Sequence, residues 1–328
     1  MSTRQRIVLD GPWHFYYDAA GDAQPDEVVN RAGWRTATVP MPWQAQFEDL
    51  RNRGGIGWYR RTLDLPAIAD EQVAVLHFGA VDYHATVWVN GVFVCEHEGG
   101  YLPFDIDITP HLTPGDNEVL VRVLDPDDDS AEWAPYAFSQ IPHGKQSWYG
   151  QTSGIWQSVW LEVRNRCHVR RLMLTPDLAR GEIAVEAPLT NAGSAEALTV
   201  HLAVFGPDGE LLKTEQGDGR GFGDTAFLLA LDAPVRPWSP DDPALYRVRL
   251  QLHRHGQVLD EIEDLCGFRT VEARSGRVYL NGRPIYLRGA LDQAYYPETI
   301  YTPSSLEMLE RQFRQAKELG FNCLRCHI

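Results

Sequence analysis

The chain has 328 residues, of which 44% are hydrophobic and 11% aromatic, and this apolar content suffices for the cores of roughly two to three globular domains. Its 45 acidic and 30 basic residues give a formal net charge of -15, and the basic residues form no run. Such a surface repels phosphate backbones and anionic membranes, which excludes nucleic-acid binding and membrane-surface binding as functions.

The amino terminus gives no sign of export. Residues 1–11 contain only three consecutive apolar residues, too few for the apolar core of a secretory signal, and no segment approaches the roughly 20 apolar residues of a membrane span. The five cysteines are an odd and scattered set, which is typical of reduced thiols rather than of a disulfide framework. We therefore expect a cytoplasmic protein.

Residues 1–165 are filled by short runs rich in Val, Ile, Trp, Tyr and Phe, separated by clusters of Gly, Pro and Asp. The runs lie at residues 13–18, 57–65, 73–80, 84–98, 117–125 and 155–164. Within the run at 84–98, Asn90-Gly91 separates two alternating halves, which is the strongest short signal for a β-hairpin. Regular short strands joined by such turns predict an antiparallel β-sandwich.

Residues 125–154 show neither a helical nor a strand period, and loops of that length inside compact domains are usually functional or disordered. Their aromatic residues argue against disorder. Flat aromatic side chains can cover the C–H face of a sugar ring, and polar side chains can bond its hydroxyls. The aromatic candidates are Trp133, Tyr136, Trp148 and Tyr149, and the polar ones are Asp125, Lys145 and Gln146. Our hypothesis is that Trp133, Lys145, Gln146 and Trp148 bind sugar.

The alternative for this loop is that its aromatic side chains pack it onto a neighbouring domain, an interpretation that suits Tyr136 and Phe138 better. The loop also holds an acidic run, residues 127–129, and carboxylates are the ligands that calcium and magnesium prefer. No glycine-spaced calcium-loop pattern follows the run, so a solvated loop is the better interpretation.

Residues 166–272 contain a second series of alternating runs, at 182–190, 197–209, 225–232 and 245–256. They predict antiparallel strands with Gly, Pro and Asp turns, in a region of the size of an immunoglobulin-like sandwich. Cys167 and Cys266 near its ends are interpreted as small buried residues. The region shows no candidate chemistry, and we expect it to orient its neighbours.

Residues 279–328 predict a strand, a loop, a helix and a second strand. The helix is indicated by a capping-box spacing of Ser304 and Glu307, and by Gly320 at the expected stop. Its apolar residues repeat at helical intervals and are Leu306, Leu309, Phe313 and Ala316. Apolar runs at 285–287 and 321–328 are the predicted strands. This β-α-β order predicts parallel pairing in a sheet with both faces covered.

In parallel sheets the loops at the carboxyl ends of the strands build the site. Polar residues occur there in this chain, namely Arg288, Asp292 and Gln293 after the first predicted strand, and Arg325 and His327 at the end of the second. Arg325 and His327 are two apart and therefore lie on one face of a strand. The alternative is that both are satisfied core polar groups.

Cys323 and Cys326 form a C-x-x-C pair in the second predicted strand. Two residues three apart on a strand point to opposite faces, and no second pair completes a zinc site. A redox or metal role is therefore disfavoured.

The chain resembles family 2 glycoside hydrolases, which include β-galactosidases, β-glucuronidases and β-mannosidases. NGRPIYLRGALDQAYYPETIYT and AKELGFNCLRCHI resemble the opening of that family's catalytic (β/α)8 barrel. Seven phrases, among them VPMPWQ, HFGAVDYHATVWVNG and SGIWQSVWLEV, resemble its jelly-roll sugar-binding domain, and WSPDDPALYRVRLQL resembles the end of its immunoglobulin-like domain. The resemblance implies a mainly β chain, with a jelly-roll sandwich at 1–165, an immunoglobulin-like sandwich at 166–272 and the first β-α-β of the barrel at 273–328.

By this resemblance the protein is the amino-terminal part of a retaining β-glycosidase, which hydrolyses O-glycosidic bonds of β-linked sugars through two glutamates about 5 Å apart. Both glutamates are expected beyond Ile328, so the chain alone would be inactive. Arg288, Asp292, Arg325 and His327 would bind the sugar or position the nucleophile's charge. Leu291-Asp292-Gln293 departs from the Asn- and His-rich stretch of β-galactosidases, which weakens the case for a β-galactoside.

The family's acid/base glutamate follows an asparagine, and Asn117-Glu118 is such a dipeptide. It opens the predicted strand at 117–125, so we interpret Glu118 as a strand residue without a catalytic role.

The alternative function is a non-catalytic carbohydrate-binding module, which needs no residue outside the chain. Against it, an exposed apolar strand such as 321–328 invites aggregation. The resemblance further implies a carbohydrate substrate, a homo-oligomer when full length and no cofactor, with room for a structural or activating magnesium or sodium ion.

Overall fold

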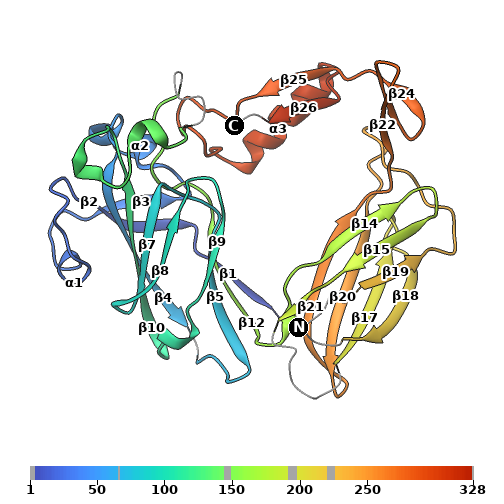
Figure 1. The fold of residues 1–328 in the computed structure, drawn as a ribbon, viewed down its shortest axis with the longest axis horizontal. Coiled ribbons are helices and arrows are strands. Elements are labelled where there is room, and N and C mark those ends of the chain that lie inside the picture. Colours follow the sequence, from blue (N-terminus) through green and yellow to red (C-terminus); the bar gives the residue numbers. More distant parts are fainter. Residues whose placement is uncertain (1–3, 66, 144–148, 191–197, 220–225, 327–328) are drawn as a thin grey trace. The chain divides into compact units, whose positions relative to one another are not determined.

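The computed structural model describes residues 4–65, 67–143, 149–190, 198–219 and 226–326. The chain forms two compact units, one comprising residues 6–163 and 289–328, and the other residues 1–5 and 164–288. Both consist mainly of β-strands, as predicted, and the first also contains a helix of 13 residues (Figure 1).

The first sandwich, at residues 5–165, contains two sheets. The larger has the order β3 (Arg35–Val39), β2 (Gly11–Tyr17), β4 (Gly55–Leu65), β10 (Gly115–Asp125), β7 (His84–Val89) and β8 (Val92–Glu98). Its strand pairs are all antiparallel. The smaller has the order β1 (Gln5–Val8), β12 (Val159–Asn165), β5 (Gln72–Phe78) and β9 (Phe104–Asp107). The predicted sandwich is confirmed.

One hydrophobic core joins the two sheets, because alternate side chains of each strand point to it. In β2 these are Trp13 and Phe15, with 2% and 0% of their surface exposed. Tyr59 of β4 and Phe78 of β5 pack into the same core from the two sheets. Aromatic side chains of this size each bury about 150–250 Å², so they dominate the stability of the sandwich.

Gly57 shows how closely this core is packed. A Cβ at that position would lie 2.7 Å from the ring of Trp43 in the short helix α2 (Trp43–Gln46), and 2.8 Å from the ring of Phe15. Real Cβ atoms do not approach ring atoms so closely, so β4 needs a glycine where it passes under these rings.

The β7–β8 hairpin turns at Asn90-Gly91, as predicted, and both residues have positive φ, 50° and 75°. Asn90 also ties the turn to β10, because its Nδ2 donates to Asn117 Oδ1 (2.9 Å) and its Oδ1 accepts from Glu118 N (2.8 Å). The Glu118 side chain pairs with Arg60 on β4. Glu118 is therefore a strand residue, as predicted.

The predicted strand at 155–164 is interrupted. Its start belongs to β11 (Gly154–Ile155), which pairs with β6 (Val81–Asp82), and its main part is β12. The other short elements of this sandwich are α1 (Pro25–Val28), η1 (Glu48–Leu50), η2 (Thr109–His111), η3 (Ala131–Trp133) and η4 (Phe138–Gln140). The last two lie in the predicted long loop, where Asp128 and Asp129 accept hydrogen bonds from the backbone N–H groups of Ser130 and Ser139.

The second sandwich, at residues 168–266, also has a continuous core. One sheet has the order β14 (Met173–Asp177), β15 (Glu182–Glu186) and β19 (Ala226–Ala230), and a short pair is formed by β13 (His168–Val169) and β16 (Leu189–Thr190). The other has the order β18 (Leu211–Asp218), β17 (Leu198–Phe205), β20 (Tyr246–Arg254) and β21 (Gln257–Cys266). The four predicted runs correspond to strands. β14, β18 and β21 lie outside those runs, and in β21 half of the ten residues are polar or charged.

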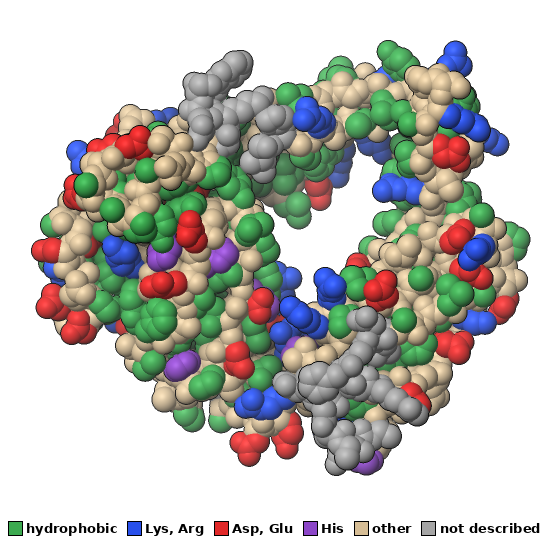
Figure 2. All heavy atoms as spheres, viewed as in Figure 1, with side chains coloured by type: hydrophobic (Ala, Val, Ile, Leu, Met, Phe, Trp, Pro, Cys, Tyr) green, Lys and Arg blue, Asp and Glu red, His purple; other side chains and the backbone are tan. Residues whose placement is uncertain are grey.

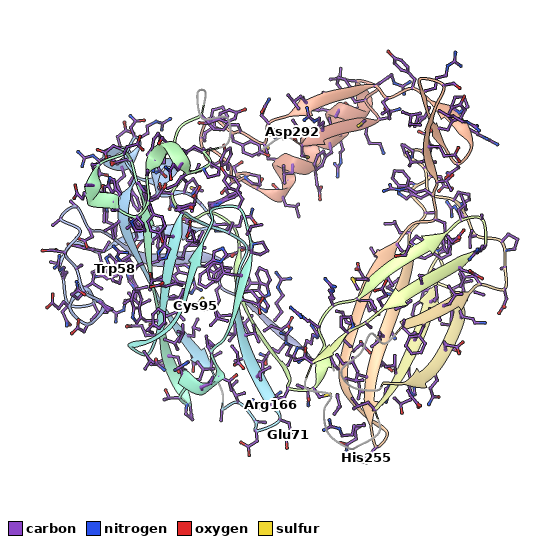
Figure 3. The ribbon with its side chains drawn as sticks, viewed as in Figure 1. Trp58, Glu71, Cys95, Arg166, His255 and Asp292 are labelled. Atoms are coloured by element: carbon purple, nitrogen blue, oxygen red, sulfur yellow. The ribbon has the colours of Figure 1, made fainter. Side chains whose placement is uncertain are left out.

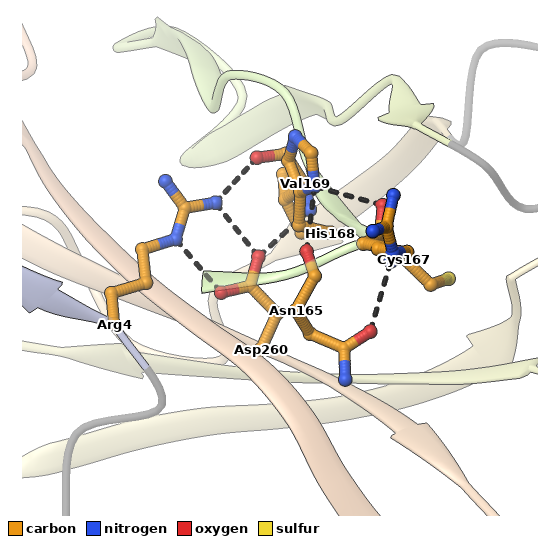
Figure 4. Close-up of polar contacts among 7 residues, drawn as sticks. Arg4, Asn165, Cys167, His168, Val169 and Asp260 are labelled. Atoms are coloured by element: carbon orange, nitrogen blue, oxygen red, sulfur yellow. Dashed lines mark hydrogen bonds and ion pairs between the residues drawn. The ribbon is translucent and has the colours of Figure 1, made fainter. Parts of the chain in front are cut away.

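The amino terminus of the chain is fixed to this second sandwich by Arg4. Its guanidinium binds both carboxylate oxygens of Asp260 in β21, at 2.8 and 2.7 Å, and also donates to Val169 O (Figure 4). Asp260 has no exposed surface, and its Oδ2 accepts a further hydrogen bond from Val169 N at 2.8 Å. We call Arg4, Asp260 and Val169 the amino-terminal clamp.

A three-stranded antiparallel sheet follows, with the order β22 (Val271–Arg274), β23 (Arg277–Leu280) and β24 (Arg283–Ile285). The prediction of a first barrel strand at 285–287 is wrong. Asn281 and Gly282 have φ of 50° and 75° and form the turn of a hairpin that pairs Ile285 with Val278. An Asn-Gly turn fixes the register of the strands beside it, which leaves 286–287 outside any strand.

The parallel β-α-β order is confirmed, and its first strand begins four residues later than predicted. β25 (Gly289–Asp292) pairs in parallel with β26 (Cys323–Cys326), and α3 (Leu306–Glu318) lies between them in sequence. The helix is capped by Ser305, whose Oγ accepts from Met308 N at 3.1 Å, and not by the predicted Ser304. Gly320, with φ 83°, follows its end as predicted.

The helix α3 has no buried residue, and Leu306 and Leu319 are 72% and 77% exposed. Exposed hydrophobic side chains are visible on this segment in Figure 2. Residues 273–288, assigned from the sequence to the barrel, lie in the unit of the second sandwich, whereas β25, α3 and β26 lie in the unit of the first.

Candidate functional site

Asp292 is the last residue of β25 and marks the carboxyl end of a parallel strand (Figure 3). Its Oδ1 accepts a hydrogen bond from Ala294 N at 2.9 Å, and Ala294 has φ 48°, so the chain turns sharply after the strand. Gln293 lies inside this turn. The turn uses one carboxylate oxygen of Asp292 and leaves Oδ2 for another partner.

A side chain from the long loop of the first sandwich reaches this strand end. The hydroxyl of Tyr149 donates to Gln293 Oε1 at 2.6 Å, although 144 residues separate the two in sequence. The Tyr149 ring stacks on Tyr295, with 4.6 Å between centroids and 18° between planes, a geometry that aromatic pairs prefer. The loop and the segment after β25 therefore form one structure.

Tyr301 completes an aromatic cluster at this place. Its ring centroid lies 5.6 Å from that of Tyr295, 6.2 Å from that of Tyr149 and 5.8 Å from that of Trp156. Burial raises the pKa of the Tyr301 hydroxyl to about 12, so it stays protonated in neutral solution. We call Tyr101, Tyr149, Trp156, Tyr295 and Tyr301 the aromatic cluster.

Hydrogen bonds fix the cluster to the backbone on both sides. Trp156 Nε1 donates to Gly100 O at 2.7 Å, and Thr302 Oγ1 donates to Trp156 O at 2.9 Å. Both bonds are buried, where unpaired polar groups would be costly. The first fixes Trp156 within the sandwich, and the second holds Thr302 against Trp156.

Two carboxyl groups of the first sandwich, Asp82 and Asp125, have no exposed surface. Thr152 Oγ1 donates to Asp82 Oδ2 at 3.5 Å, and Ser153 Oγ donates to Asp125 Oδ2 at 2.5 Å. Gln44 Nε2 in turn donates to Ser153 Oγ at 2.6 Å. The Oδ1 atom of each carboxyl has no hydrogen-bond partner among the described residues. We call Asp82 and Asp125 the buried carboxyl pair.

The buried carboxyl pair favours protonated forms. The pKa of Asp125 is raised to about 7, chiefly by burial and also by the nearby charge of Asp127, against the lowering effect of hydrogen bonds with Ser153 and Gln151. Burial also raises the pKa of Asp82 well above its ordinary range, and the charge of Asp125 adds to this effect. Two carboxylates in one buried site cannot both ionise cheaply, so the pair holds at least one proton near neutral pH.

Two family models match the chain. One is described as "Glycosyl hydrolases family 2, sugar binding domain" and matches residues 7–163, and the other as "Glycosyl hydrolases family 2" and matches residues 167–269. Together they match most of the chain. The chain belongs to glycoside hydrolase family 2.

The curated relatives include proteins named β-galactosidase and proteins named β-glucuronidase. A β-galactosidase of Psychromonas ingrahamii is 27% identical over 97% of this chain, and a β-glucuronidase of Paenibacillus borealis is 28% identical over 88% of it. The matches span 33% and 49% of those proteins, so this chain corresponds to less than half of each. A solved structure of a β-glucuronidase of Bacteroides uniformis superimposes with a TM-score of 0.80 at 25% identity, over 99% of this chain and 40% of that one.

The family 2 chain brings together some of the residues predicted from its sequence. Asp292 lies at the strand end beside Tyr149, a loop residue named for its aromatic ring. Arg325 lies on β26 opposite Leu291, whereas Asp292 lies opposite Cys326, and neighbouring residues of a strand point to opposite faces. Arg325 and Asp292 therefore lie on opposite faces of this two-stranded sheet.

The other predicted residues lie elsewhere. Arg288 precedes β25 and falls in the unit of the second sandwich. Trp133 packs against a second hydrophobic cluster that contains Trp58, which is labelled in Figure 3. Four predicted residues lie outside those that the structure describes, namely Lys145, Gln146, Trp148 and His327.

The buried carboxyl pair and most of the aromatic cluster were not predicted as site residues. Tyr295 and Tyr301 lie within the stretch that carries the family resemblance, and three tyrosines within seven residues after a strand end are a signal for an aromatic surface. Asp82 is a charged residue directly after Phe78, Gly79, Ala80 and Val81, but nothing in the sequence indicates that Asp125 lies near it.

Two further observations concern the described part of the chain. No group of three or more His, Cys, Asp or Glu side chains within it could hold a metal ion. None of its helices is both long and apolar enough to cross a membrane.

Proposed function

We propose that this chain supplies the sugar-binding part and the first strands of the barrel of a retaining β-glycosidase that hydrolyses O-glycosidic bonds of β-linked sugars. The hydrogen bond between Tyr149 and Gln293 carries the proposal, because it joins the loop of the first sandwich to the carboxyl end of a parallel strand. Family membership and the names of the relatives support it.

In this proposal Asp292 binds the substrate. Its Oδ1 is used by the turn, so Oδ2 is the atom that accepts a hydrogen bond from a sugar hydroxyl. The Tyr149 hydroxyl occupies Gln293 Oε1, which leaves the Gln293 amide N–H groups to donate to the same sugar. Tyr149 acts by positioning Gln293.

The chemistry requires two carboxyl groups about 5 Å apart, one acting as acid/base and the other as nucleophile. We assign both to later strands of the barrel, outside these 328 residues. Arg325 lies on the sheet face opposite Asp292, so we do not assign it to the sugar that Asp292 binds. His327, outside the described residues, remains a proposed substrate-binding residue. A cytoplasmic location and homo-oligomeric assembly of the whole enzyme belong to the same proposal.

Hydrolysis of aryl β-glycosides by a polypeptide that contains this chain and the residues encoded after it tests the proposal. We expect hydrolysis with retention of configuration, and loss of about 100-fold or more in kcat/KM for Asp292→Ala, since a lost buried contact to a sugar hydroxyl costs at least about 2.7 kcal/mol in the transition state. Asp105→Ala, at an exposed position of β9, is the matched control.

Failure to hydrolyse any β-glycoside, combined with sugar binding by the 328-residue chain alone, would favour a non-catalytic carbohydrate-binding module. Unchanged kinetics of Asp292→Ala would remove Asp292 from the site.

A further inference from the structure

The outward face of the second sandwich's four-stranded sheet is polar and carries a groove. In β17 and β20 every second residue is buried, among them Leu202 and Leu250, so the residues between them point outward. The strand register places outward residues in rows across the sheet. One row contains Gln216, His201, Gln251 and Glu261, and the next contains Thr214, Ala203, Arg249 and Glu263.

Ala203 creates the groove because its side chain is shorter than its outward neighbours. A shallow groove of about 480 Å³ lies here, and its lining includes Ala203, His201 and Arg249. This volume lies within the range of roughly 300–1,000 Å³ that is typical of small-ligand sites.

Two side chains of the lining, His201 and Arg249, are planar and are held in place by stacking. The His201 imidazole stacks on His253, with 4.0 Å between ring centroids and 20° between planes. The Arg249 guanidinium lies over the ring of Phe205, 5.1 Å from its centroid. Flat side chains held in this way suit the C–H faces of a pyranose ring, since such contact needs an immobile planar surface.

The charges around the groove are arranged to disfavour a charged ligand. Arg249 Nε donates to Glu263 Oε1 at 2.6 Å, and Glu261 accepts from Gln251 Nε2 at 2.5 Å. Glu215 contributes a carboxylate to the lining itself, whereas Glu261 and Glu263 lie beside lining residues. An anion would meet these carboxylates, while a cation would compete with an arginine that already neutralises Glu263.

Uncharged hydrogen-bonding groups remain in the lining. Thr214 supplies a hydroxyl, Gln216 supplies an amide, and both are exposed at the edge strand β18. A hydroxyl both donates and accepts, and an amide does the same through its two ends, which matches the hydroxyls of a sugar.

We propose that this groove is a binding site for an uncharged oligosaccharide, separate from the strand-end site. One sugar ring lies over Ala203, with its faces against His201 and the Arg249 guanidinium and its hydroxyls bonded to Thr214 and Gln216. The site would keep a polymeric carbohydrate attached while its ends are processed elsewhere.

Titration of the purified 328-residue chain with neutral β-linked disaccharides and tetrasaccharides, followed by calorimetry, tests this proposal. Ala203→Met fills the groove, and we expect it to weaken binding at least about tenfold. Ala184→Met is the matched control, because Ala184 is an outward-facing alanine of β15 on the other sheet of the same sandwich, and it should bind like the unaltered chain.

Gln216→Ala is a second variant, at an exposed residue whose loss cannot unfold the sandwich, and it should weaken binding about three- to tenfold. Saturable binding that Ala203→Met leaves unchanged would overturn the proposal, as would binding confined to acidic sugars or no binding at all.

Asp292→Ala separates this proposal from the proposed function. Binding that persists in Asp292→Ala and is lost in Ala203→Met assigns the sugar to the groove. Binding lost in Asp292→Ala and kept in Ala203→Met assigns it to the strand end and overturns the groove, while the glycosidase proposal stands.

Discussion

Replacement of Asp125 by asparagine should stabilise the first sandwich at high pH. Asparagine keeps the shape of the side chain, and its Oδ1 can still accept the hydrogen bond from Ser153, but it removes a buried group that ionises. The groups around it in the structure are Asp82, Asp127, Gln151 and Ser153, and the two carboxyl groups can only make its ionisation harder.

The magnitude follows from linkage. The pKa of Asp125 is raised to about 7 from an ordinary value of 3.8, so between these values the folded state binds more protons than the unfolded state. The free energy of unfolding therefore falls as pH rises from about 4 to about 7. At 1.36 kcal/mol for each pH unit, the fall in unfolding free energy attributable to Asp125 is about 4 kcal/mol, and the raised pKa of Asp82 adds a loss of the same sign.

Urea unfolding monitored by tryptophan fluorescence at about pH 5 and about pH 9 measures this effect. Relative to the unaltered chain, Asp125→Asn should be more stable by about 1.6 kcal/mol at the lower pH and by about 4 kcal/mol at the higher, because roughly two of the three pH units over which stability is lost lie above pH 5. Asp105→Asn, exposed on β9, should change neither value. A variant no more stable than the unaltered chain at pH 9 would refute the reasoning, because the buried charge would then carry no cost.

Other parts of the structure give three further predictions. Arg4→Ala leaves Asp260 buried without its ion pair and should lower the unfolding free energy of the second sandwich by about 3–5 kcal/mol, and a loss below about 1 kcal/mol would contradict this. Tyr149→Phe keeps the ring stack but removes the strand-end hydrogen bond. It should lower the unfolding free energy of the first unit by about 0.5–1.5 kcal/mol and speed proteolysis of residues 289–326. Unchanged cleavage rates would show that the bond is dispensable. Gly57→Ala places a methyl 2.7 Å from the Trp43 ring and should destabilise by about 1–3 kcal/mol in thermal unfolding, and an unchanged melting temperature would mean that the rings yield freely.

Sequence alone predicted those features that depend on neighbours along the chain. Strand alternation and Asn90-Gly91 gave the sandwich and its hairpin, because side-chain period and turn conformation are local properties. The same logic placed a strand at 285–287 in error, because Asn281-Gly282 was not interpreted as a hairpin turn. It holds the register of β23 and β24.

The candidate site was predicted less completely, because it is built from pairs distant in sequence. Asp292 could be found from its place at a strand end. The contact between Tyr149 and Gln293 spans 144 residues, and no local pattern encodes it. Arg325 had a predicted strand but no predicted register, and the register decides that it faces away from Asp292.

The amino-terminal clamp has a consequence for folding order. Its ion pair joins residues 256 positions apart, so most of the chain must be arranged before the bond can form. Closing a loop of that length costs entropy that is offset only after most native contacts have formed. Contacts that are absent from the folding transition state act mainly on the unfolding rate. The contact between Arg4 and Asp260 should therefore form late in folding, and it would act mainly by slowing the opening of the finished sandwich.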